Sequence, residues 1–246
     1  MSAFLGEIIG TMLLILLGDG VVANVLLNKS KGQNAGWMVI TTGWGLAVFV
    51  GAYSVASVSG AHLNPAVTIG LAVAGNFEWG QVFPYIIAQM IGAFLGAVLV
   101  YLHYFPHWAP TSDAGLKLAV FSTGPAIRSV VWNLVSEIIG TFALVFGILV
   151  IKGATMDSSG SAVPLNMGAL GIIPVAFLVW GIGLSLGGPT GYAINPARDL
   201  GPRIAHFLLP IPGKGDSDWG YSWIPVVGPI IGGALGAILW VALGKF

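Results

Sequence analysis

Hydrophobic residues follow one another in six long stretches of the chain, each close to the ~20 residues that a helix needs to cross the hydrocarbon core of a bilayer. Segments richer in Pro, Ser, Thr and Gly separate some of them, and two of these, Phe105–Val131 and Gly153–Asn166, are expected to be surface loops. The pattern predicts an all-α membrane protein. Its spanning helices are expected at Phe4–Leu27, Trp37–Val58, Gln81–Tyr104, Trp132–Lys152, Met167–Leu186 and Tyr221–Leu243.

Two further apolar stretches, Pro65–Gly75 and Pro196–Leu208, are too short to span a bilayer. At ~1.5 Å per residue each crosses about half of a ~30 Å core. Asn precedes Pro at each start, and this pair favours a helix start because Asn is a preferred N-cap and Pro is tolerated at the first helical position. The pattern predicts two re-entrant half-helices, which in a membrane protein indicate where a solute passes. Their first residues form the triplets Asn64-Pro65-Ala66 and Asn195-Pro196-Ala197.

The chain carries an internal repeat. The sequence from Glu7 to Thr11 recurs 130 residues later from Glu137 to Thr141, and the two Asn-Pro-Ala triplets have nearly the same spacing. Each half holds three spans, so the second half must insert upside down relative to the first. We therefore expect one membrane domain over residues 1–246, with repeat one at about 1–115 and repeat two at about 130–246. The two half-helices are expected to enter from opposite faces and to meet near the midplane.

Composition narrows the class of protein. Hydrophobic residues make up 56% of the chain and charged residues 7%, which excludes an ordinary soluble domain. There is no Cys, and a net charge of zero without a basic patch argues against nucleic acid as a partner. His103, His107 and His206 share no ligand spacing, so neither a metal nor a cofactor is expected.

With these motifs the chain resembles the major intrinsic protein family, the aquaporins, over essentially all 246 residues. The motifs appear in fuller form as Ser59 to Ala66 and Asn195 to Asp199. The branch of glycerol facilitators, or aquaglyceroporins, is the most similar, because Asp199, Arg203 and Pro225-Val226 stand where that branch carries such residues. The resemblance implies a homotetrameric channel in the cell membrane, of bacterial plasma-membrane type.

The resemblance also implies a four-residue selectivity filter at the outer mouth. Its members map to Trp44, Gly183, Tyr192 and Arg198. Water-selective relatives usually place His at the position of Gly183, so a wider pore is implied. Tyr192 departs from the Phe that is more usual in glycerol facilitators, which leaves the preferred solute open.

Several residues near the motifs have two interpretations. Asn64 and Asn195 can cap their half-helices while their amide NH₂ groups face the lumen and orient a passing oxygen. Glu7 and Glu137 are interpreted as acceptors for N–H groups of the re-entrant loops, with a proton relay as the alternative. For His62 the interpretation is a loop histidine, with a pH gate as the alternative. The loop residues whose main chain is expected to line the pore are Gly60, Ala61, His62, Leu63, Gly191, Ala193 and Ile194.

The predicted function is a passive channel for glycerol and other small uncharged solutes, with water alongside. The alternatives are a mainly water-selective pore and, in a different class, an alternating-access transporter. An enzyme is not expected: the Gly-x-Ser-x-Gly pattern around Ser185 would need a histidine base within hydrogen-bond reach, and it is a weak signal in a glycine-rich membrane helix. The physiological solute, among glycerol, dihydroxyacetone, urea, peroxide and neutral lactic acid, stays open, as does gating.

Two indications of the orientation of the chain in the membrane disagree. The family resemblance implies a cytoplasmic N-terminus, which leaves only Lys152 and Lys245 on the inner side. The positive-inside rule favours the reverse. The basic residues on the outer side would be Lys29, Lys31, Lys117, Arg128, Arg198, Arg203 and Lys214.

Overall fold

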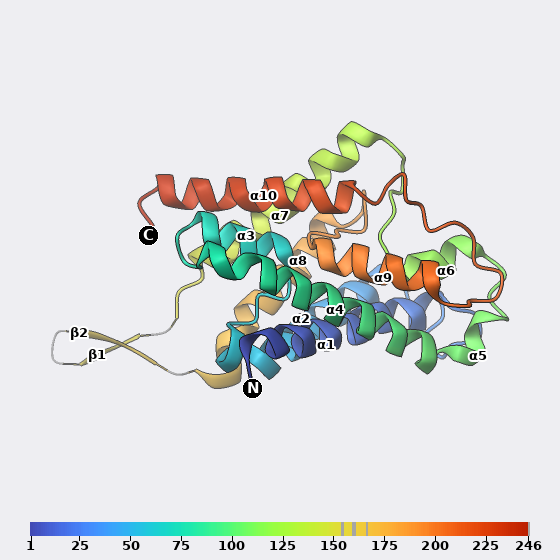
Figure 1. Ribbon diagram of the computed structural model, residues 1–246, viewed down its shortest axis with the longest axis horizontal. Helices are drawn as coiled ribbons and strands as arrows, with labels where there is room; N and C mark the ends of the chain where they lie inside the picture. The colour runs from blue at the N-terminus through green and yellow to red at the C-terminus, as the bar shows by residue number, and fades with distance from the viewer. Residues whose placement is uncertain (154, 159–160, 166, 246) are drawn as a thin grey trace.

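The computed structural model describes residues 1–153, 155–158, 161–165 and 167–245. Within these residues, six helices are long and apolar enough to cross a membrane, as the hydropathy pattern predicted. They lie roughly side by side along the long axis of the molecule (Figure 1). Their bounds are α1 Ala3–Leu26, α2 Trp37–Ser59, α4 Trp79–His103, α7 Val130–Val150, the 3₁₀ turn η1 Gly168–Ile172 with α8 Ile173–Leu186, and α10 Ile224–Ala242.

The two predicted half-helices are present as α3 (Pro65–Val73) and α9 (Pro196–Leu208). They lie in opposite halves of the molecule, α3 toward the end that holds both chain termini and α9 toward the other end (Figure 1). Each has Asn as its N-cap and Pro in its first turn. The arrangement is the one expected from two repeats that insert in opposite directions.

Glycines set the close packing of neighbouring helices in both halves. A Cβ on Gly92 of α4 would lie 2.3 Å from the Ile8 carbonyl oxygen of α1, and one on Gly232 of α10 would lie 2.2 Å from the Ile138 carbonyl oxygen of α7. Ile8 and Ile138 are equivalent in the repeat. Because any side chain at these glycines would collide with main chain, both helix pairs depend on small residues for their contact.

The segment Phe105–Val131 is not the plain surface loop that the sequence predicted. It contains α5 (Phe105–Trp108) and α6 (Ala114–Phe121), and Trp108 and Phe121 are fully buried. The Trp108 indole donates to the Tyr101 carbonyl oxygen at 2.9 Å and stacks on Phe121. Buried aromatic area therefore draws this segment back onto the helices, where α6 contacts α1 and α9.

The predicted loop Gly153–Asn166 differs as well, because part of it pairs with itself. Strands β1 (Thr155–Ser158) and β2 (Ser161–Pro164) form an antiparallel hairpin in which Thr155 faces Pro164. The hairpin extends away from the helical body at the end that holds the termini (Figure 1). Residues 154, 159–160 and 166 of the predicted loop lie outside the described residues. This small sheet is the one departure from an all-α architecture in the described part of the chain.

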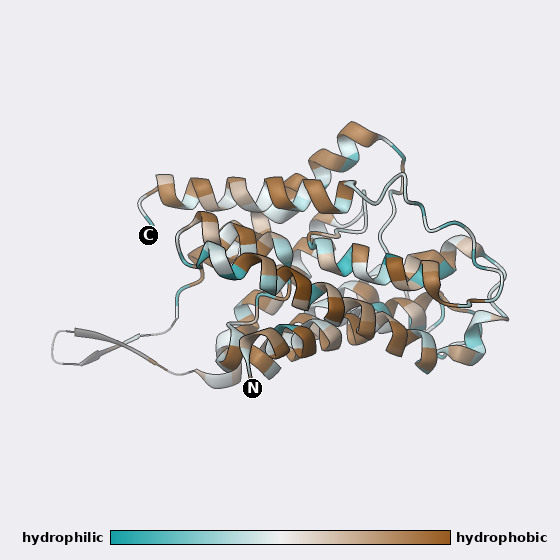
Figure 2. Ribbon diagram, in the orientation of Figure 1, coloured by the Kyte–Doolittle hydropathy of each residue, from teal (hydrophilic) through white to brown (hydrophobic). Residues whose placement is uncertain are grey.

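The outer surface of the long helices is apolar. Hydrophobic residues dominate these helices, while hydrophilic ones gather in the loops and on α9 (Figure 2). Large apolar side chains are exposed on them, such as Phe83 on α4 and Trp132 on α7, each 71% exposed. Since a soluble protein rarely leaves so much apolar surface in water, this is the surface of a multi-pass membrane protein.

Candidate functional site

Asn64 and Asn195 begin the two half-helices with the same contacts. The Asn64 side-chain oxygen accepts from the main-chain N–H of Ala66 at 2.8 Å and of Val67 at 3.4 Å. The Asn195 oxygen accepts from Ala197 at 3.0 Å and from Arg198 at 3.2 Å. Each side chain thus satisfies N–H groups that a helix start leaves without partners, and the predicted caps are confirmed.

The amide nitrogens of the two asparagines tie the repeats together. Asn64 Nδ2 donates to the Ile194 carbonyl oxygen at 2.8 Å, and Asn195 Nδ2 donates to the Leu63 carbonyl oxygen at 2.8 Å. The sequence interpretation had left both hydrogens of each amide for the lumen, which is wrong, because one of them bonds to the opposite repeat. An amide NH₂ has two donors, so a second N–H remains on each asparagine, and both residues border the cavities described below.

The loops before the asparagines have an unusual main chain. Gly60, Ala61 and Leu63 have positive φ values of 78°, 53° and 52°. Gly191, Tyr192 and Ile194, which are equivalent in the repeat, have values of 80°, 39° and 42°. Non-glycine residues in this region cost of order 1–3 kcal/mol each and persist only where surrounding structure holds them.

Glu7 holds the first loop in place. Its two carboxylate oxygens accept from the main-chain N–H of His62 at 3.0 Å and of Leu63 at 2.8 Å. They also accept from the Ser59 hydroxyl and from the Gln89 amide, at 2.7 and 2.8 Å. Glu7 is fully buried, and each of its carboxylate oxygens accepts two of these hydrogen bonds.

Glu137 does the same for the second loop. It accepts from the main-chain N–H of Ala193 at 3.0 Å and of Ile194 at 2.8 Å, and from the Thr190 hydroxyl at 2.7 Å. These are the contacts that the sequence predicted for both glutamates. Both glutamates are fully buried, and every one of their carboxylate oxygens accepts a hydrogen bond. This favours the structural interpretation over a proton relay.

Three cavities follow one another in the protein, each sharing lining residues with the next. An inner cavity of about 160 Å³, on the side of α3, shares Asn64 and Asn195 with a middle cavity of about 50 Å³. The middle cavity is the smallest of the three, and we call it the constriction. Trp44, Tyr192 and Arg198 line both the middle cavity and an outer one. The loop residues bordering the inner cavity are Gly60, Ala61, His62 and Leu63; Ala193 and Ile194 border the middle cavity, and Gly191 the outer one.

Arg198 has three partners at this constriction. Its Nη1 donates to the Phe121 carbonyl oxygen at 3.2 Å and lies 3.4 Å from a carboxylate oxygen of Asp19. Its Cζ atom lies 4.2 Å from the centre of the Trp44 ring. The guanidinium therefore lies over the Trp44 face. Arg198 is buried, with 6% of the residue exposed. Sequence reasoning did not single out Asp19, although an acidic residue inside a predicted span is a sufficient signal by itself.

Gly183 lies behind the constriction and not on its wall. A Cβ at Gly183 would lie 2.7 Å from Tyr192 Cζ, so the Tyr192 ring occupies the space in front of it. Gly183 does not line the middle or outer cavity. The sequence interpretation, in which the missing side chain itself widens the lumen, is replaced by one in which the glycine makes room for Tyr192.

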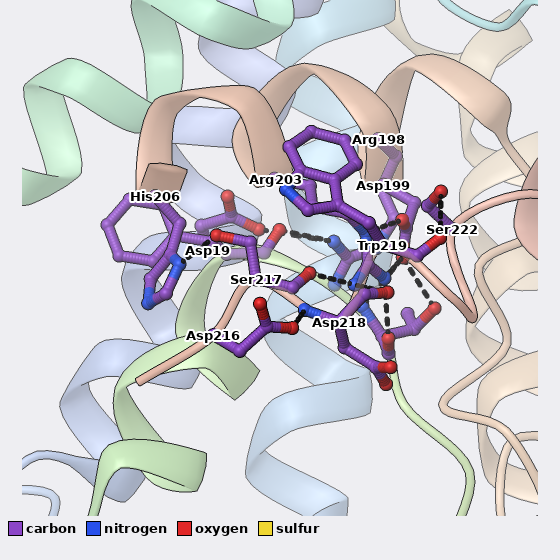
Figure 3. A network of polar contacts seen from close by, with 12 residues as sticks. Asp19, Arg198, Asp199, Arg203, His206, Asp216, Ser217, Asp218, Trp219 and Ser222 are labelled. Carbon is purple, nitrogen blue, oxygen red and sulfur yellow. Dashed lines mark hydrogen bonds and ion pairs between the residues drawn. The ribbon is translucent and has the colours of Figure 1, made fainter. Parts of the chain in front are cut away.

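Asp199 and Arg203 fix α9 to the loops around the mouth (Figure 3). Arg203 Nε donates to Asp199 at 2.8 Å, and its Nη1 donates to the Ser217 carbonyl oxygen at 2.7 Å. Asp199 also accepts from the Thr123 N–H at 2.8 Å. Both side chains are fully buried. This network holds Thr123, two residues after the end of α6, and so keeps the Phe121 carbonyl oxygen beside Arg198.

The remaining candidate residues have ordinary partners. His62 Nδ1 lies 3.1 Å from the Thr68 hydroxyl, and its ring packs on Phe77 and Tyr85 while bordering the inner cavity. No hydrogen bond in the described part of the chain joins Ser185 to a histidine base. No group of metal-ligating side chains is found among the described residues either.

Comparison with known proteins gives consistent results. The sequence model of the major intrinsic protein family matches residues 1–240. A "Probable glycerol uptake facilitator protein" of Thermotoga maritima is 63% identical over 98% of both chains. A "Glycerol uptake facilitator protein" of Bacillus subtilis is 58% identical, over 100% of this chain and 86% of its own. The solved structure of the aquaglyceroporin from Plasmodium falciparum superposes with a TM-score of 0.82 at 32% identity, covering 96% of this chain and 93% of that one.

Proposed function

The chain belongs to the major intrinsic protein family, and on that basis we propose that it is a passive transmembrane channel for glycerol and other small uncharged solutes, with water alongside. It would form one channel domain of two repeats. It would catalyse no reaction and need no cofactor. The observation that supports this most directly is the constriction, where an aromatic pair and one arginine border the same narrow cavity.

The chemistry of the constriction suits a polyol. Trp44 and Tyr192 offer apolar ring surface to the CH groups on one side of a three-carbon chain. Arg198 and the loop carbonyls offer donors and acceptors to the hydroxyls on the other side. Such a wall favours glycerol over solutes that do not match both sides, because burying a hydroxyl without a hydrogen-bond partner costs free energy.

Charged species are excluded at the centre of the path. Each half-helix N-terminus carries roughly half a positive charge, and both point toward the region where Asn64 and Asn195 meet. The available N–H of each asparagine donates to a passing oxygen, so that a water held between them directs its hydrogens outward. This arrangement opposes cations and interrupts proton transfer along a water file.

The assembly in the membrane follows from the same proposal. The protein would be a homotetramer in a bacterial plasma membrane, with its N-terminus in the cytoplasm. The basic residues on the opposite side run against the positive-inside rule, and this orientation is proposed from the family alone. Of these basic residues, Lys214 donates to the carbonyl oxygens of His206, Phe207 and Leu209 at 2.6–2.7 Å, and the side-chain hydrogen bonds and charge of Asp218 raise the pKa of Arg128.

The test is solute flux in proteoliposomes, measured by light scattering with glycerol, urea, dihydroxyacetone and a water gradient. The expected result is a glycerol flux that stays linear with concentration and has a low activation energy. Water flux without glycerol flux would instead indicate a water-selective pore. Saturation at millimolar glycerol with coupling to an ion gradient would indicate an alternating-access transporter.

A further inference from the structure

Asp19 lies inside a spanning helix, is fully buried, and faces Arg198 at 3.4 Å. We propose that Asp19 is a positioning residue of the filter: it holds the Arg198 guanidinium against the Trp44 ring and balances its charge, so that the lumen stays wide enough for a three-carbon polyol. The inference rests on the proposed function and adds α1 to the elements that set solute preference.

The position of Asp19 beside a glycine gives the first argument. A Cβ on Gly18 would lie 2.2 Å from Cζ3 of Trp44, so the indole ring lies directly on the main chain of α1. The next residue, Asp19, then reaches the guanidinium that covers the same ring. Two successive residues of α1 therefore set the position of the ring and of the charge above it.

The inverted repeat gives the second argument. The residue three after the first motif asparagine is Val67, where the second half has Arg198, and the residue 130 after Asp19 is Leu149. Val67 and Leu149 are both buried in the hydrophobic core, 6% and 8% exposed. One mouth thus has an apolar residue at both equivalent positions, and the other has a charged residue at both. The acid is present where the arginine is present, as expected if it serves the arginine.

The surrounding charges give the third argument. The other buried acid and base of this region, Asp199 and Arg203, bond to each other and to loop main chain, as Figure 3 shows beside Asp19 and Arg198. Asp19 is therefore the carboxylate that pairs with Arg198 among the described residues. Without it, Arg198 would keep only the Phe121 carbonyl and the ring face, and its long side chain could turn into the lumen.

The experiment is a double-mutant cycle in full-length protein in proteoliposomes, with Asp19→Asn, Arg198→Ala and both together. Each is measured for glycerol and water permeability and for melting temperature in detergent. Asp19→Asn keeps the shape of the side chain and removes its charge. We expect its glycerol-to-water permeability ratio to fall about three- to tenfold, while the same substitution changes the ratio less than about twofold once Arg198 is Ala.

A purely structural Asp19 gives a different result, because its removal would lower both permeabilities equally whether or not Arg198 is present. That outcome overturns the inference. In melting temperature, Arg198→Ala alone should be the least stable of the set, since it leaves a buried carboxylate unpaired, and adding Asp19→Asn should recover part of the loss. If the second substitution does not raise the melting temperature, that result also contradicts the proposed pairing of Asp19 with Arg198.

If Asp19→Asn cannot be purified, Asp19 and Arg198 can be replaced by the residue types found at the equivalent positions of the other repeat, Leu149 and Val67. Asp19→Leu with Arg198→Val should fold with a higher melting temperature than Arg198→Val alone, and an equal or lower value overturns the inference. Failure of the proposed function is seen separately, as wild-type vesicles that pass no glycerol. The coupling between Asp19 and Arg198 can then still be measured from water permeability and stability.

Discussion

The ring of Tyr192 fills the space in front of Gly183, where a Cβ would lie 2.7 Å from the tyrosine Cζ and 2.8 Å from its hydroxyl oxygen. At Gly187, the C-cap residue that follows α8, a Cβ would likewise lie 2.6 Å from Cδ1 of the Tyr192 ring. The tyrosine ring therefore packs against the C-terminal end of α8, where these two residues have no side chain. The width of the constriction depends on these two glycines because they let the ring withdraw from the lumen.

Gly183→His should push the Tyr192 ring into the path. Glycerol permeability is expected to fall by an order of magnitude or more, and water permeability much less, because a single file of water needs less width. Stopped-flow light scattering on the same vesicles gives both values. The matched control is Gly181→Ala on the same helix, where a Cβ meets nothing within 4 Å and both permeabilities should be unchanged. Equal loss of both in a well-folded Gly183→His protein would mean that Gly183 does not set solute preference through Tyr192.

Tyr192→Phe tests whether the hydroxyl contributes to solute preference. The hydroxyl oxygen is buried and has no hydrogen-bond partner among the described residues. Removing an unsatisfied polar atom of this kind is expected to leave the melting temperature unchanged or slightly higher. The ratio of glycerol to water permeability should change less than about twofold, because the ring shape is kept. A larger change would mean that the hydroxyl contacts the solute.

Asn64→Asp separates the two roles of the motif asparagine, which are to cap the half-helix and to donate hydrogen bonds from its amide nitrogen. An aspartate oxygen can still cap α3, but the donor to the Ile194 carbonyl is lost and a negative charge is placed where the two half-helices meet. Cation or proton leak should rise severalfold, measured with a pH dye inside liposomes under an imposed potential. Asn195→Asp, which removes the donor to Leu63, is the repeat-related comparison and should behave alike. Unchanged leak in both variants would contradict the exclusion mechanism.

The sequence predicted those parts of the fold that depend on local pattern. Span length, the Asn-Pro helix starts and the duplicated Glu7 and Glu137 follow from residues close together in the chain, and the structure has them at the expected places. The inward course of Phe105–Val131 was missed because it depends on the burial of Trp108 and Phe121 against distant helices. Composition alone describes that segment as a polar loop.

The constriction could be predicted in part. Arg198 and Trp44 were proposed from a family resemblance, but the stacking of one on the other and the pairing with Asp19 were not. Asp19 and Arg198 are 179 residues apart, so no local pattern joins them. The place of Gly183 behind Tyr192 was also missed, since a motif identifies a residue without showing which neighbour fills the space beside it.

Glu137→Gln should affect folding more than conduction. The substitution replaces one of the two carboxylate oxygens that accept from Thr190, Ala193 and Ile194 by an NH₂ group, so at least one buried N–H loses its acceptor. A loss of about 1–3 kcal/mol is expected for a buried donor left without a partner. It would appear as a lower melting temperature and a lower yield of purified protein, while glycerol flux per folded channel stays within about twofold, because the carboxylate does not border the cavities. Glu78→Gln is the control, since Glu78 is exposed and makes no side-chain cap hydrogen bond at the start of α4. A stable Glu137→Gln protein that has lost its flux would instead make Glu137 part of the conducting path.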